Sequence, residues 1–338
     1  MIASAPDLLR LVVLPVFAWA AWRDINTRRL PNRLWPPLVG LGVVLLAWEA
    51  IQLAPFGTFE GRLFLVQAGV SLLFIAPLGY AFWWLGGFGG ADAKALITLA
   101  ILLPTFPSYA VGSHFLPLVE TPIGVFSLTV LTNTVLVAAA VPVLLTVYNL
   151  SQGDIAPRVM VFARRVDRES IPDRHGTLFE TPDGITRGGL DLDALRMYLR
   201  WRGLTLADVR ADPEDHRDPA SVTDTYEPTD GGTHVGPRTD GGRVVEDEAS
   251  ADSAEPATVD DFDDPWAAER FFESIDGTAY GSSPEGLRAA LELLSKTDRQ
   301  QLWVSPGLPF VVPMFVGLLV AFTYGDLLFG LFGWLGLF

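Results

Sequence analysis

The sequence has no cysteine among its 338 residues and only four histidines. Without cysteine, disulfide bonds, thiol catalysis and cysteine-based metal sites are excluded. The histidines are scattered, and the sequence contains neither an HExxH zinc motif, nor a Gly-x-Ser-x-Gly nucleophile motif, nor a glycine-rich phosphate-binding loop. The sequence therefore predicts no metal, no cofactor and no nucleotide.

Lysine is almost absent as well, since Lys94 and Lys296 are the only lysines among 24 basic residues. The formal net charge is −15, although half of the residues are hydrophobic. Acid-rich surfaces of this kind are typical of proteins that work at high salt, where surface charges are strongly screened. We therefore expect a halophilic source, and the acidic balance excludes a basic nucleic-acid-binding surface.

The charged and the hydrophobic residues occupy different parts of the chain. Residues 1–148 and 304–338 together hold seven basic and seven acidic residues, whereas residues 149–303 hold 17 and 32. This alternation predicts membrane spans around a water-exposed insertion, hence an all-α polytopic membrane protein with a small α+β and partly disordered insertion. The expected parts are a membrane domain at 1–150, an acidic cytoplasmic insertion at 151–302, and a last span within 303–338.

Crossing the ~30 Å hydrocarbon layer takes roughly 20 apolar residues in a helix. Six stretches qualify, at 8–22, 35–53, 63–85, 95–110, 123–150 and 307–335. Arg10, near the start of the first span, is the only basic residue up to its end, while four arginines follow it within residues 23–33. Because basic loops stay in the cytoplasm, we expect the N-terminus outside and residues 23–34 inside. Residues 86–94 and 151–306 then also lie on the cytoplasmic side of the cell membrane.

The insertion changes in texture along its length. Residues 155–210 contain a short alternating run at 158–165 and an amphipathic helix at about 190–201, which predicts a small α+β unit. Residues 211–264 are rich in Asp, Glu, Thr, Gly and Pro, which predicts a disordered linker, with a docking surface for basic partners as the alternative. A helical patch at 266–274 and 284–294 leads back to the membrane.

Two aspartates stand at predicted cytoplasmic ends of spans. Asp24 lies in the polar loop after the first span, where a single carboxylate is usually a solvated anchor or a helix cap. Asp92 follows the glycine-rich stretch at 86–90 and precedes the fourth span. A helix N-cap is an ordinary structural role for an aspartate at such a position. Glycines also let helices approach closely, so that a carboxylate faces the protein interior, and an ionisable group placed there is a functional candidate.

The pair predicts more than either aspartate alone. Two close carboxylates share a proton and titrate together. One can then take a proton from an attacking water, while the other protonates the oxyanion and the leaving group. We therefore expect an aspartic peptidase with Asp24 and Asp92 as its catalytic residues.

The same residues resemble a known family. Asp24 begins the pattern Asp-x-x-x-x-x-Leu-Pro-Asn-x-Leu after a first span, and a glycine-rich turn ends in Asp92 with Lys94 two residues on. This arrangement is similar to type IV prepilin peptidases, and most of all to the archaeal preflagellin and prepilin peptidases. The segment 303–313 resembles the segment that ends many archaeal members. The resemblance covers the membrane part, about half of the chain.

The resemblance implies roles for individual residues. Asp24 and Asp92 correspond to the two catalytic aspartates, and Gly89 corresponds to the first glycine of the GxGD signature. Ala91 stands where the signature has its second glycine, so the motif here reads Gly89-Gly90-Ala91-Asp92.

Three other residues are expected to support the site. Pro31 and Asn32 are expected to fix the turn into the second span, with Asn32 as its cap. Lys94 either favours the ionised form of Asp92 or anchors the helix at the interface.

The family cleaves a short basic leader from pilin-like and archaellin precursors at the cytoplasmic membrane face. These precursors and membrane lipid are therefore the expected partners. Bacterial relatives often add a methyltransferase activity with a cysteine-containing loop, and this chain has no cysteine, so we expect peptidase activity only. The alternative is a non-catalytic scaffold, or a proton- or cation-coupled transporter that uses the same aspartates. Transport, however, predicts ionisable residues near the bilayer midplane.

Overall fold

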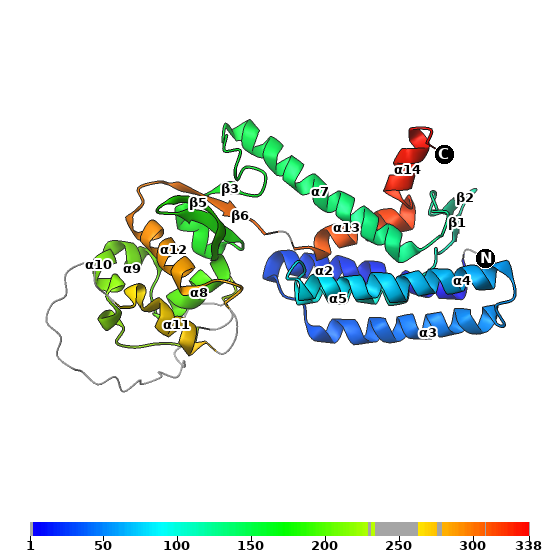
Figure 1. Cartoon of the computed structure of the whole chain (residues 1–338), viewed down its shortest axis with the longest axis horizontal. Helices are drawn as coiled ribbons and strands as arrows, with labels where there is room; N and C mark the ends of the chain where they lie inside the picture. The colour runs from blue at the N-terminus through cyan, green and yellow to red at the C-terminus, as the bar shows by residue number, and fades with distance from the viewer. Residues whose placement is uncertain (1–2, 229–230, 234–262, 276–278, 308, 338) are drawn as a thin grey trace. The chain divides into compact units, whose positions relative to one another are not determined.

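The structure is a computed structural model that describes residues 3–228, 231–233, 263–275, 279–307 and 309–337 (Figure 1). The chain divides into two compact units, Met1–Val141 with Leu308–Phe338, and Pro142–Gly307. The long helix α7 (Phe126–Gln152) contributes residues to both units. The sequence-based boundaries at 150 and 302, which refer to membrane and water, stay a prediction.

Apolar helices make up most of the first unit. A chain that passes through lipid must satisfy its backbone groups internally, and a helix does so within a single segment. A two-stranded antiparallel hairpin, β1 (Tyr109–Val111) and β2 (His114–Leu116), joins α6 to α7. Besides the first part of α7, the helices are α1 (Ala5–Arg10), α2 (Val13–Thr27), η1 (Asn32–Leu34), α3 (Trp35–Leu53), α4 (Phe59–Val70), the π-helix η2 (Ser71–Ile75), α5 (Ala76–Trp84), α6 (Gly90–Leu102), α13 (Val311–Thr323) and α14 (Leu327–Trp334).

Within the described residues, four helical segments are long and apolar enough to cross a membrane. They are Ala5–Thr27, Asn32–Leu53, Phe59–Trp84 and Phe126–Gln152, and α13 is a shorter apolar helix. The chain is thus a mostly helical membrane protein with a small sheet region, but the predicted count of six spans is not confirmed.

Two of the six predicted spans are shorter or broken in the structure. The predicted span at 95–110 ends as a helix at Leu102, because Pro104 and Pro107 follow and neither has the backbone N–H that a helix needs. The predicted span at 307–335 is divided into α13 and α14. The break falls at Gly325, which has φ 102°, and Asp326 then caps α14 through the backbone N–H of Phe329 at 3.0 Å.

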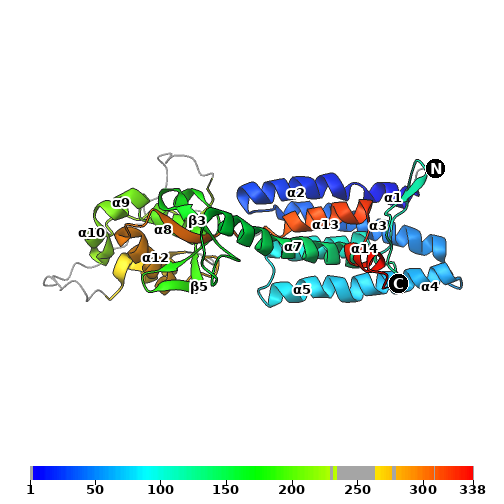
Figure 2. The same ribbon diagram turned by 90° about the horizontal axis from the view of Figure 1, so that it is seen from above.

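The buried core of the first unit lies where α2, α3, α6 and α13 pack together. Phe17, Leu45, Leu99 and Leu318 are fully buried there, one from each of these helices. Figure 2 shows α2 and α13 side by side, as their contacts require. Gly42 lets α3 approach α6, since an added Cβ would lie 3.0 Å from a backbone atom of α6. This packing fixes α6, whose first turn carries one of the two aspartates.

The second unit is a four-stranded antiparallel sheet with helices on one face. The strand order is β3-β6-β4-β5. The strands are β3 (Arg164–Asp167), β4 (Thr177–Thr181), β5 (Gly184–Asp191) and β6 (Gln301–Ser305). The helices are η3 (Arg168–Asp173), α8 (Leu192–Trp201), α9 (Leu206–Ala211), α10 (Pro213–Arg217), η4 (Pro219–Ser221), η5 (Pro265–Ala267), α11 (Ala268–Ser274) and α12 (Pro284–Lys296). The apolar faces of α8 and α12 bury Leu178, Leu302 and Val304 of the sheet.

Several expectations for the insertion can be compared with this unit. The amphipathic helix at 190–201 is confirmed as α8, and the helical patch is confirmed as η5, α11 and α12. The alternating run at 158–165 was wrong as a strand, because β3 begins only at Arg164 and the residues before it form turns. The predicted linker at 211–264 begins too early. Asp212 and Asp218 cap α10 and η4, so the chain folds beyond residue 211. The part of the linker at 234–262 lies outside the described residues.

Candidate active site

Asp24 lies in the last turn of α2 and is only 7% exposed. The sequence predicts a loop there, and this was wrong because the helix continues past Trp22 to Thr27. Asn26 Nδ2 donates a hydrogen bond to the carbonyl of Trp22 at 2.6 Å, and Thr27 Oγ1 donates one to the carbonyl of Arg23 at 3.0 Å. These polar side chains satisfy carbonyl groups at the end of the helix. A helix, and not a loop, therefore holds the Asp24 carboxyl group.

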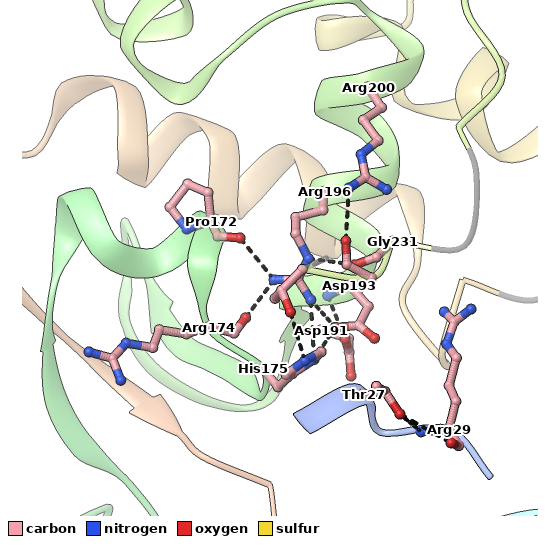
Figure 3. Close-up of polar contacts among 12 residues, drawn as sticks. Thr27, Arg29, Pro172, Arg174, His175, Asp191, Asp193, Arg196, Arg200 and Gly231 are labelled. Carbon is pink, nitrogen blue, oxygen red and sulfur yellow. Dashed lines mark hydrogen bonds and ion pairs between the residues drawn. The ribbon is translucent and has the colours of Figure 1, made fainter. Parts of the chain in front are cut away.

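The helix ends at Arg28, which adopts the left-handed conformation with φ 54°. Its backbone N–H donates to the carbonyl of Asp24 at 3.0 Å. The N–H of Arg29 donates to Thr27 Oγ1 at 3.4 Å, which closes the turn (Figure 3). The chain thus reverses immediately after Asp24 and leads into α3.

Asp92 occupies the first turn of α6, where a negative charge is favoured by the positive end of the helix dipole. Its Oδ2 accepts a hydrogen bond from the backbone N–H of Gly89, the residue that precedes the helix, at 3.2 Å. A Cβ added at Gly89 would lie 3.0 Å from this same oxygen. Gly89 therefore leaves room for the carboxylate that it binds, which is a physical reason for a glycine at this point of the motif.

The two carboxyl groups interact electrostatically. Burial, followed by the negative charge of Asp24, raises the pKa of Asp92 to about 6 from its usual 3.8. The hydrogen bond from Gly89 and the positive charge of Arg28 act in the opposite direction, but they do not overcome burial. The structure thus brings together two aspartates that are 68 positions apart in the sequence. It also lets Asp92 keep its proton up to about pH 6.

The sequence did not single out Arg28 as a residue of the site. Its positive charge acts on both Asp24 and Asp92, because the turn after α2 brings it back toward them. The sequence feature that could have identified Arg28 was its position four residues after Asp24, in the basic stretch at 23–33. The sequence analysis used that stretch only to orient the first span.

The residues predicted to support the site lie as follows. Lys94 Nζ donates a hydrogen bond to Asn32 Oδ1 at 2.6 Å, and this contact ties α6 to the turn before α3. Asn32 was expected to cap the second span, which was wrong: Pro31 precedes η1, and the Asn32 side chain accepts from Lys94. Pro31 has φ −67°, the value that its ring imposes, and leads the chain into η1. Gly90 begins α6, and a Cβ added there would make an ordinary van der Waals contact, 3.8 Å from Trp83 Nε1.

A second group of ionisable side chains lies in the second unit (Figure 3). Arg196 pairs with Asp193 and also donates to the carbonyl groups of Arg174 and Gly231. His175 Nδ1 lies 3.1 Å from Asp193 Oδ1. The hydrogen bonds of Arg196 hold residue 231 and the turn before β4 against α8, so we interpret this cluster as structural. No group of three or more metal-ligating His, Asp or Glu side chains is found in the part of the chain that the structure describes.

Comparison with known proteins finds two stretches of the chain that match peptidase family models. Residues 11–147, which include Asp24 and Asp92, match the type IV leader peptidase family. Residues 251–327 match the archaeal peptidase A24 C-terminus, type II. Two separate stretches of the chain are therefore similar to models of this kind of peptidase. The second match runs from the second unit into α13 of the first unit. Both units therefore contain sequence that matches models of this kind of peptidase.

Two relatives are each 30% identical to this chain over the residues that align. A preflagellin peptidase from Methanococcus voltae aligns over 154 residues, which is 45% of this chain and 60% of the relative. Prepilin peptidase EppA from Methanothermobacter thermautotrophicus aligns over 150 residues, 43% of this chain and 36% of the relative. The chain therefore spans less than two thirds of the length of either relative.

The raised pKa of Asp92 predicts that its ionised form destabilises the fold. In the unfolded chain, Asp92 loses its proton near pH 3.8, whereas the folded chain keeps it until about pH 6. The folded chain binds more protons in this interval, so its stability falls as the pH rises, by about 2 to 3 kcal/mol in total. Asp92→Asn carries no charge and should therefore be more stable than the unmodified chain at pH 7.5, and equally stable below pH 4.

Thermal unfolding of both proteins in detergent across this pH range measures the difference. The exposed Asp183→Asn is a matched control, and its stability should follow the unmodified chain at every pH. Equal stability of Asp92→Asn and the unmodified chain at pH 7.5 would contradict the burial of an ionised carboxylate.

Proposed function

We propose that this chain is an aspartic endopeptidase that removes the short basic leader of type IV pilin-like and archaellin precursors at the cytoplasmic face of the membrane. The observation that carries the proposal is the electrostatic interaction of Asp24 with Asp92, which come from different helices of the membrane unit. The match of residues 11–147 to the type IV leader peptidase family supports the same reaction, because the matched residues include both aspartates.

The chemistry follows from one proton shared by two carboxyl groups. We place the shared proton on Asp92, whose pKa is raised to about 6, so that Asp24 is the ionised member of the pair. The ionised carboxylate takes a proton from water as the water oxygen attacks the carbonyl carbon of the scissile peptide bond. The protonated carboxyl group gives its proton to the carbonyl oxygen. When the tetrahedral intermediate collapses, the C–N bond breaks and the leaving amine receives a proton from the pair.

The negative charge of the aspartate pair favours a basic leader. The ionised member of the aspartate pair attracts positive charge, and attraction of this kind raises the local concentration of a cationic substrate. The basic stretch at 23–33 predicts that this end faces the cytoplasm, where the leader of a membrane-inserted precursor would remain. We propose peptidase activity without methyltransferase activity, since the chain has no cysteine and the loop after its first span is short.

Arg28 is expected to set the pH dependence of cleavage. Its positive charge lowers the pKa of Asp92, so Arg28→Gln should raise that pKa. Because the pair must keep one proton, cleavage is lost as the pH rises through the pKa of the protonated member. The high-pH limb of the profile should therefore move up by ~0.5 to 1 pH unit in Arg28→Gln. Arg28→Lys keeps the charge, and its profile should match that of the unmodified chain.

The function is tested by incubating the full chain in proteoliposomes with a pilin-like precursor. Mass spectrometry of the products should show a released leader and a shortened precursor with one new N-terminus. Inhibitors of serine, cysteine and metallopeptidases should leave the reaction intact. If the precursor stays whole while the chain is folded and inserted, the peptidase proposal fails, and the scaffold or transporter alternative takes its place.

A further inference from the structure

In the second unit, α7 is followed by a tightly folded segment, which we call the collar and define as residues 153–165. The fully buried Asn149 near the end of α7 holds it in place. Asn149 Nδ2 donates hydrogen bonds to the carbonyl groups of Met160 and Ala163, both at 2.7 Å. The backbone N–H of Asp154 donates to the carbonyl of Asn149 at 2.9 Å. The collar is therefore fixed to the last turns of the long apolar helix.

The inner side of the collar covers the sheet. Val159, Met160 and Ala163 form a small buried core with Trp303 of β6. Side chains alternate along a strand, and the neighbours of Trp303 in β6 pack on the helices, so Trp303 and the collar lie on the opposite face of the sheet. The guanidinium of Arg165 lies 5.5 Å above the Trp303 ring and 3.2 Å from Asp154 Oδ1. The inner side of the collar is therefore packed firmly against the sheet.

The outer side of the collar is apolar where a water-soluble protein would be polar. Ile155 is 71% exposed and Phe162 is 60% exposed. The exposed side chains Val143, Leu144, Val147 and Leu150 lead to it along α7. A helix of 27 residues is about 40 Å long, which is more than the ~30 Å of hydrocarbon in a bilayer. If α7 crosses the membrane, its end and the collar therefore reach the headgroup region.

The charge of the collar is opposite to that of its surroundings. The collar, residues 153–165, holds three arginines and one aspartate, whereas residues 149–303 as a whole hold 17 basic and 32 acidic residues. Arg165 is paired with Asp154, but among the described residues Arg158 and Arg164 form no ion pair. Arg158 also lines an open hollow of about 550 Å³, together with Val159, Phe162, Phe179, Ile185 and Thr186.

We propose that the collar binds the anionic headgroups of membrane lipids. Arg158 and Arg164 contact lipid phosphates, while Ile155 and Phe162 enter the boundary between headgroups and hydrocarbon. A basic side chain near an anionic lipid surface strengthens association about fivefold. An acidic unit would otherwise be repelled from such a surface, and the collar holds it at the point where the chain leaves the bilayer. This inference does not depend on the peptidase reaction.

The absence of cysteine allows a direct test with the full chain. Phe162→Cys and, as a control, Glu273→Cys each receive a nitroxide spin label. Glu273 is exposed on α11, which packs on the other face of the sheet. In bilayers with phosphatidylglycerol, we expect the label at 162 to become accessible to oxygen and protected from a water-soluble nickel complex. The label at 273 should stay accessible to the nickel complex. Equal accessibility of both labels to the nickel complex would overturn the proposal.

The role of the arginines is tested in the same chain. In bilayers of phosphatidylcholine alone, protection of the label at 162 should fall several-fold. Arg158→Gln with Arg164→Gln should remove the difference between the two lipid mixtures, and high salt should weaken it. Protection that is independent of lipid charge would overturn the binding of anionic headgroups. Protection that arises only after a pilin-like precursor is added would show that the collar binds protein and not lipid.

Discussion

Replacing either Asp24 or Asp92 by asparagine is expected to lower the rate of precursor cleavage by about 10³-fold or more, which in practice abolishes it. An amide has nearly the same size as a carboxyl group, but it can neither take a proton from water nor give one to the leaving amine. Loss of one acid–base group typically costs 10² to 10⁴ in rate. Because both groups act on the same proton, the double variant should be no slower than either single variant.

The measurement is the release of leader from a pilin-like precursor in membranes that contain equal amounts of each variant. Glu120→Gln is a matched control, since Glu120 is an exposed carboxylate in the same unit, on the side predicted to face away from the cytoplasm. It should cleave at the unmodified rate. Normal processing by Asp24→Asn or Asp92→Asn would remove that residue from the catalytic pair.

Replacing Arg10 by methionine is expected to have the largest effect on stability. Arg10 is 1% exposed, and all three of its guanidinium nitrogens are bonded. Nη1 lies 3.0 Å from Asp7 Oδ1, Nη2 lies 2.7 Å from Glu49 Oε2, and Nε donates to the carbonyl of Leu102 at 3.2 Å. Removal of the guanidinium would leave two carboxylates and the end of α6 without their partner. Breaking a buried ion pair in this way costs about 3 to 5 kcal/mol.

A thermal shift of the purified protein in detergent measures this loss. The matched control is the triple variant Arg10→Met with Asp7→Asn and Glu49→Gln, in which no carboxylate remains unpaired. It should recover much of the lost stability, since most of the cost of a broken pair comes from the charge left behind. If the single variant is as stable as the unmodified chain, Arg10 does not join α1, α3 and α6 in the way described.

Much of the first unit could be predicted from the sequence alone. Long apolar stretches have few stable forms in lipid, so the helices over 35–53, 63–85 and 123–150 follow from composition and length. The amphipathic pattern of α8 was equally clear. The breaks within the predicted spans at 95–110 and 307–335 were harder to predict, because a mean apolar character does not show where a proline, a left-handed glycine or a capping aspartate ends a helix.

The sequence by itself determined the types of chemistry that the chain can carry. It excluded thiols, and it identified two aspartates that stand beside helices and fit one family pattern. Only the tertiary structure decided that Asp24 is buried, that its charge acts on Asp92, and that the positive charge of Arg28 acts on both. It also decided that Arg10, which in the sequence is one flanking charge, is a buried link between helices. The physical reason is that electrostatic energy depends on distance and burial, and both arise only when separate helices pack together.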